Sequence, residues 1–117
     1  MGTLEDEFAY ATCCNLATLD ELISIKATSK HRIERQRKIA LKMLIACKEA
    51  ESVRTLIESD AKTWSPRYNR VGEIFRVAET APEGIQGALD AFIARLTATY
   101  SGLRLPRKTE GATPEGK

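Results

Sequence analysis

Residues 30–62 read KHRIERQRKIALKMLIACKEAESVRTLIESDAK and contain no glycine or proline. Because Ser29 is a suitable N-cap, this stretch predicts one uninterrupted α-helix of about nine turns. Apolar side chains recur along it at spacings of three and four and form a single stripe: Ile39, Met43, Ala46, Ala50, Val53, Ile57, Ala61 and Trp64. Such a stripe is either a packing face or a seam between chains. We expect self-association through it, and therefore a homodimer.

A second apolar row lies beside the first half of this stripe and comprises Ile33, Ala40, Leu44 and Cys47. The helix is therefore apolar on most sides around residues 39–47, which indicates a central position in the fold. In so small a protein, a second copy of the chain can supply part of the covering of this helix.

The flanking sequence predicts three or four further helices and no strands, because β-branched alternation and hairpin turns are absent. Thr3 can cap a helix over residues 4–16, and Thr18 with Glu21 has the spacing of a capping box for a short second helix or a kinked continuation. Another helix is expected to start at Ser65-Pro66, with Val71, Ile74, Phe75 and Ala78 as its apolar face, and a last one to run from Ile85 to Gly102. The sequence predicts an all-α bundle of four or five helices over residues 1–102 and a flexible tail over residues 103–117.

Charge is distributed unevenly along a chain whose net charge is only +2 over 117 residues. Residues 1–25 contain five carboxylates and no Lys or Arg, whereas residues 26–42 contain seven Lys and Arg residues and one Glu. Two interpretations remain open: the acidic segment pairs with the basic one in the same or a neighbouring chain, or the basic segment meets an anionic partner.

Four basic residues of the long predicted helix fall within about 60° of one another around its axis: His31, Arg35, Lys38 and Lys42. They lie opposite the Ile33, Ala40 and Leu44 row, so they can face solvent while that row is buried. Cations clustered in this way can neutralise successive phosphates of a nucleic acid, or bind an acidic protein surface.

A second candidate site is the turn around Arg67, Tyr68 and Arg70. Arginine can bind a phosphate through two hydrogen bonds, and tyrosine can stack on a base. The alternative is an ordinary polar turn between helices, with Trp64 anchored in the core.

Signatures of catalysis, metal binding and membrane insertion are absent from the sequence. It contains no phosphate-binding glycine loop, no nucleophile elbow and no HExxH motif, and its single histidine and three cysteines lack metal-ligand spacing. We therefore expect no enzyme activity, cofactor or metal, and we expect the cysteines to be buried in a reducing compartment. With no apolar run of membrane-spanning length and no basic residue in the first 25, a cytoplasmic location is expected. The sequence predicts a small regulatory or adaptor protein that binds a protein partner, with nucleic-acid binding as the alternative.

Overall fold

A computed structural model describes residues 3–25, 29–63 and 67–101, which form five α-helices and no strand. The helices are α1 (Leu4–Ser24), α2 (Lys30–Glu49), α3 (Glu51–Lys62), α4 (Asn69–Ala78) and α5 (Gly84–Tyr100). The predicted all-α class is confirmed. The predicted tail over residues 103–117 and the expected helix end at Gly102 lie outside the described residues.

The first helix is longer than its sequence predicts. Thr3 begins it as expected, because its hydroxyl accepts a hydrogen bond from the Asp6 N–H and the Asp6 carboxylate accepts one from the Thr3 N–H. Of the two alternatives expected after Thr18, the separate second helix is wrong and the helix continues: the Thr18 hydroxyl donates to the Cys14 carbonyl at 2.9 Å within one unbroken helix. Continuing the helix keeps Leu16, Leu19 and Ile23 on one buried face, which a break would disperse.

The single long helix predicted over residues 30–62 is also wrong, because the chain breaks at Ala50. This residue has extended backbone angles (φ −87°, ψ 103°). It is both the C-cap of α2 and the N-cap of α3. A straight helix over all 33 positions would be about 50 Å long, whereas the 21 residues of α1 span about 32 Å. Its second half would have little to pack against, so the break brings the apolar face of α3 back onto the bundle.

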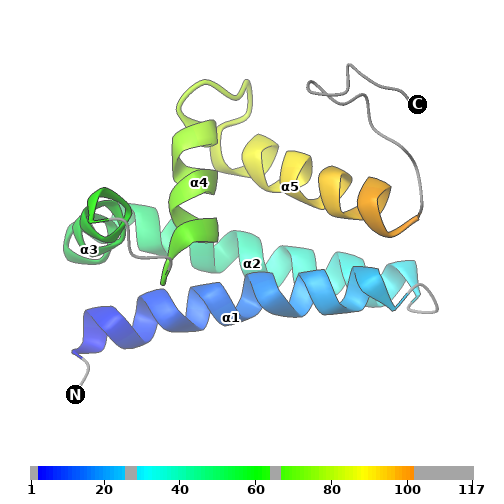
Figure 1. The fold of residues 1–117 in the computed structure, drawn as a ribbon, viewed down its shortest axis with the longest axis horizontal. Coiled ribbons are helices and arrows are strands. Elements are labelled where there is room, and N and C mark those ends of the chain that lie inside the picture. The colour runs from blue at the N-terminus through cyan, green and yellow to red at the C-terminus, as the bar shows by residue number, and fades with distance from the viewer. Residues whose placement is uncertain (1–2, 26–28, 64–66, 102–117) are drawn as a thin grey trace.

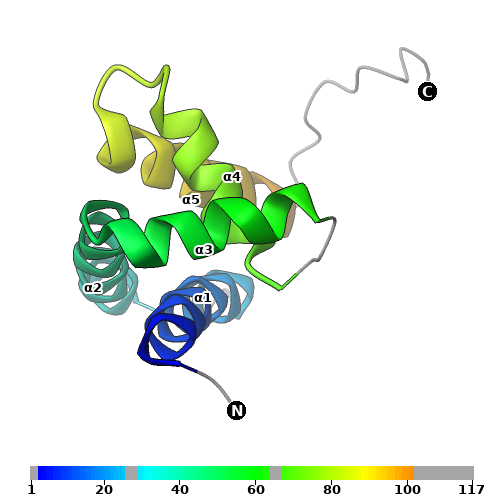
Figure 2. The ribbon, with the colours of Figure 1, turned by 90° about the vertical axis from the view of Figure 1, so that its left-hand side faces the viewer.

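The helices α1 and α2 lie side by side and run in opposite directions, and α3 crosses one end of this pair (Figures 1 and 2). The helices α4 and α5 pack against each other, and α5 also contacts α1 and α2. One core joins all five elements, and its largest fully buried side chains are Leu16, Leu19, Leu44, Cys47, Ile57, Val71, Leu89 and Thr12. The long, central helix of the sequence prediction is thus replaced by an α1–α2 pair with α3 set across it.

The fourth helix buries its predicted apolar face, and in α5 two apolar side chains, Ala88 and Leu89, are buried. In α4 the four predicted side chains are buried, namely Val71, Ile74, Phe75 and Ala78. The turn before α5 ends at Gly84, whose positive φ of 61° lies in the left-handed region that glycine adopts without steric cost. The predicted helix start at Ser65-Pro66 lies outside the described residues, and α4 itself begins at Asn69.

Candidate functional site

The outer face of α2 carries the basic cluster predicted from the sequence. Ala40, Leu44 and Cys47 are completely buried on the inner side of this helix, and Ile33 is half-buried beside them. Because these side chains fix the orientation of the helix, the opposite side faces solvent. All four predicted basic residues are exposed there: His31, Arg35, Lys38 and Lys42.

These four side chains have no ion-pair partner among the described parts of the chain. The five salt bridges found there involve other cations, and the nearby Arg37 is the one on α2 that pairs, with Glu34 at 3.4 Å and with Asp90 of α5 at 3.0 Å. Two of the five carboxylates of α1 have other contacts: Asp6 accepts from Tyr68, and Asp20 pairs with Arg70 at 2.9 Å. Pairing between α1 and the basic cluster within one chain is therefore not observed in residues 3–25 and 29–63.

Two isoleucines flank the cations on this face. Ile39 is 42% exposed and Ile45 is 39% exposed. At 100° per residue they lie about 60° to either side of Lys42. The surface is therefore a mixed one, with cations along its middle and apolar side chains at both edges; we call it the α2 face and define it by His31, Arg35, Lys38, Ile39, Lys42 and Ile45.

The second predicted site, around Arg67, Tyr68 and Arg70, is part of the internal packing. Tyr68 is only 3% exposed, its hydroxyl donates to Asp6 at 2.9 Å, and its backbone N–H donates to the buried carboxylate of Asp60 at 3.1 Å. Burial, together with the hydrogen bond to Asp6, raises the pKa of Tyr68 to about 12. The phenol ring is thus not accessible for stacking on a base in this structure, and these contacts favour the alternative of a turn between helices that is engaged in packing.

The two arginines of this turn also hold the fold together. Arg67 donates to Asp60 at 3.3 Å and stacks over the Tyr68 ring, while Arg70 bridges to Asp20 of α1. The start of α4 lies at the far end of α3 from α2 (Figure 2). This turn and the α2 face therefore do not form one surface.

The stripe predicted as the self-association seam is divided between core and surface. Val53 and Ile57 are 4% and 0% exposed and belong to the core of the single chain. Ala50 is at the break, and Trp64 and the side chain of Ala61 lie outside the described part of the chain. The other three members, Ile39, Met43 and Ala46, lie on the outer side of α2 and are absent from the core cluster and from the side chains packed against it.

The cysteines are only partly buried. Cys47 is buried and its sulfur lies 3.0 Å from the Thr12 hydroxyl, whereas Cys14 is exposed, against the prediction of burial. Cys13 is half-buried, and desolvation raises the pKa of its thiol to about 11. No group of three potential metal ligands occurs in the described ranges.

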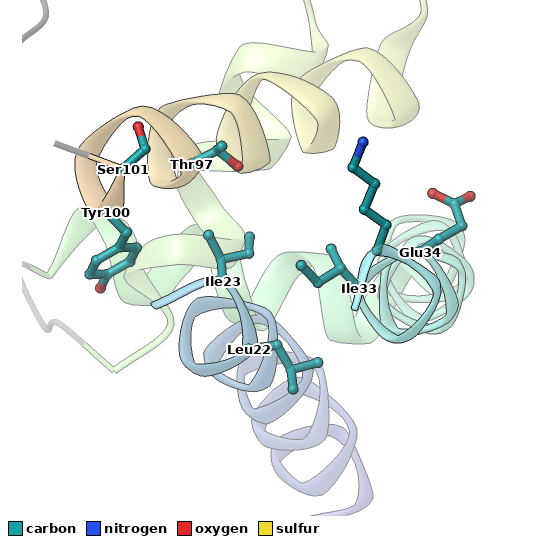
Figure 3. A pocket seen from close by; sticks show the side chains of 8 residues that line it. Leu22, Ile23, Ile33, Glu34, Thr97, Tyr100 and Ser101 are labelled. Atoms are coloured by element: carbon teal, nitrogen blue, oxygen red, sulfur yellow. The ribbon is translucent and has the colours of Figure 1, made fainter. Parts of the chain in front are cut away.

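Sequence reasoning missed an open pocket of about 720 Å³ where α1 ends, α2 begins and α5 ends (Figure 3). Ile23 and Ile33 project into it, and Thr97 and Ser101 line it from α5. Tyr100 lies at its edge and donates a short hydrogen bond to Asp20, which raises the pKa of the phenol. No pattern along the chain could have identified this pocket, because its walls come from three helices that meet only in the folded molecule.

Comparisons with protein-family models, with curated proteins and with solved structures find no match to this chain. None of the described helices combines the length and the apolar character that crossing a bilayer requires.

Proposed function

We propose that this protein is a small, non-enzymatic regulatory or adaptor protein of the cytoplasm that binds an acidic protein partner through the α2 face. It acts by binding alone, without a cofactor. The proposal includes self-association, because part of the predicted stripe remains on the surface of α2.

The observation that carries this proposal is the composition of the α2 face. Its four cations are exposed and form no ion pair within the described residues, so a partner's carboxylates would not have to displace internal ones. Ile39 and Ile45 beside them offer apolar area that a protein surface can bury. A phosphate backbone would leave this apolar area exposed, which favours a protein partner over nucleic acid.

The charges and the apolar edges have different parts in such a complex. Exposed ion pairs contribute about 0–1 kcal/mol each and mainly accelerate and orient the encounter. Burial of the two isoleucines contributes to the binding free energy in proportion to the area covered, at about 25 cal/mol for each Å² of apolar surface removed from water. We therefore expect the partner to present an acidic surface with an apolar centre.

The test is affinity capture from host extract with the wild-type protein and with a Lys38→Glu/Lys42→Glu variant. A matched control is Lys62→Glu/Arg76→Glu, which makes the same charge change at exposed positions of α3 and α4. A protein retained by the wild type and the control but lost from the first variant is the expected result. A partner retained equally by all three would refute a role for the α2 face.

Nucleic-acid binding is the second candidate, favoured by the 60° arc that the four cations share. It no longer includes the turn at Arg67, Tyr68 and Arg70, since those side chains are engaged in the fold. This function requires binding to duplex DNA or single-stranded RNA that falls steeply between about 50 and 200 mM salt and weakens in Arg35→Glu. Absence of binding at low salt would eliminate it.

A further inference from the structure

A short apolar stripe on the outside of α2 is absent from the hydrophobic core formed by the described residues. It consists of Ile39, Met43 and Ala46, spaced i, i+4 and i+7, and these side chains lie within about 60° of one another around the helix. Ile39 is 42% exposed, Ala46 is exposed and Met43 is half-buried. The three residues make a narrow ridge of the kind that packs against another helix.

The charges along one edge of this ridge are arranged so that the ridge complements itself. Arg35 and Glu49 are both exposed on the flank that also carries Lys42. The midpoint of Arg35 and Glu49 along the helix is Lys42, and the midpoint of Ile39 and Ala46 lies between Lys42 and Met43. Arg35 and Glu49, which carry opposite charges, are thus placed at equal distances on either side of Lys42, and the ridge ends Ile39 and Ala46 are centred within one residue of the same position.

We propose that a second copy of this chain docks on this ridge with its α2 running in the opposite direction. A two-fold axis near Lys42 and Met43 places Ile39 against Ala46 of the second copy and brings the two Met43 side chains together. The same operation places Arg35 beside Glu49 of the second copy. Each of the two unlike contacts forms twice, as an interface between identical chains requires.

This inference names the surface for the self-association proposed above and does not depend on the identity of the acidic partner. Lys38 and Lys42 lie beside the ridge rather than on it, about 50–100° away around the helix. Lys38 therefore remains exposed in the dimer, whereas the two Lys42 side chains, which share the flank of Arg35 and Glu49, come near each other at the axis and oppose the two attractive contacts. The cations of the two copies then line one flank of the paired helices, where Ile45 of each copy remains available to that partner while the second copy covers Ile39.

The size of the contact sets the strength that we expect. From Arg35 to Glu49 the helix is about 21 Å long, and a single pair of helices over this length makes an interface at the small end of the specific range. We therefore expect a reversible dimer that dissociates on dilution.

The test is sedimentation equilibrium of the full-length protein with charge reversal at the two ends of the ridge. Arg35→Glu and Glu49→Arg each convert two attractive contacts into repulsive ones, and we expect each to raise the dissociation constant about tenfold. The double variant Arg35→Glu/Glu49→Arg exchanges the charges and restores the dimer. An equimolar mixture of the two single variants forms a heterodimer tighter than either homodimer.

The controls separate this arrangement from other outcomes. Arg76→Glu changes an exposed charge on α4 and leaves the dissociation constant unchanged, and circular dichroism verifies that every variant keeps its helix content. A wild type that remains monomeric at millimolar concentration overturns self-association, while capture of an acidic partner would still stand. A wild-type dimer that single reversals do not weaken, or that the double reversal does not restore, overturns the antiparallel arrangement alone.

Discussion

Replacing Asp60 by asparagine tests whether the turn before α4 stabilises the fold. The carboxylate is buried, with 5% of the residue exposed, and its two oxygens accept hydrogen bonds from the Tyr68 N–H at 3.1 Å and from the Arg67 guanidinium at 3.3 Å. Asparagine has nearly the same shape, so it removes the charge and one acceptor without leaving a cavity. Either the Tyr68 N–H or the Arg67 guanidinium then loses its acceptor at position 60, and the donor that keeps one is bound to a neutral instead of a charged acceptor.

The loss of stability depends on how deeply each of the two hydrogen-bond donors is buried. A hydrogen bond to a charged group contributes about 1.5–3 kcal/mol, but the side chain of Arg67 is 60% exposed, so its bond belongs at the low end. The Tyr68 N–H is buried and accounts for most of the loss. We expect Asp60→Asn to lower the free energy of unfolding by about 2–3 kcal/mol, equivalent to a fall in Tm of roughly 10 °C or more.

Urea denaturation followed by circular dichroism measures this change. Glu58→Gln is the matched control, because it makes the same chemical change at an exposed position of the same helix, and it should stay within about 0.5 kcal/mol of the wild type. If Asp60→Asn proved as stable as the control, the assignment of this turn to the fold would be refuted, and Arg67 and Tyr68 would again be candidates for binding.

Three further perturbations test other parts of the structure. Ala50→Ser should raise the free energy of unfolding by about 1 kcal/mol in urea melts, since serine can cap α3 where alanine forms no side-chain cap; a fall in stability would contradict the helix start. Ile57→Ala should destabilise the chain by about 2–5 kcal/mol and Ile39→Ala by under about 1 kcal/mol in the same assay, and equal losses would refute the division of the stripe. Because the pKa of Tyr68 in the folded chain, about 12, exceeds its ordinary value of 10.0, the contribution of this phenol to the free energy of unfolding is complete below pH 10 and declines as pH rises through 12. Urea midpoints between pH 8 and 12 should show this decline in the wild type but less of it in Tyr68→Phe, and identical profiles would contradict the burial of the phenol.

Local pattern was sufficient for several features. The spacing of Val71, Ile74 and Phe75 predicted which side of α4 is buried, and the opposition of Lys38 and Leu44 around α2 predicted which side of that helix faces solvent. These predictions succeed because the 3.6-residue repeat fixes relative directions around a helix, whatever the helix packs against.

Tertiary contacts decided where the helices end and which exposed residues are free to bind. A continuous apolar stripe through Ala50 gave no local sign of a break, since the break depends on the length of α1 and on the core that receives Ile57. Tyr68 lies in a sequence that suits an anion-binding turn, yet Asp6 and Asp60, eight and more positions away, hold it inside. The periodicity of this chain determined its helical character and the cationic side of α2. Only the packed molecule decided what each apolar stripe covers, because burial depends on residues that are distant in sequence.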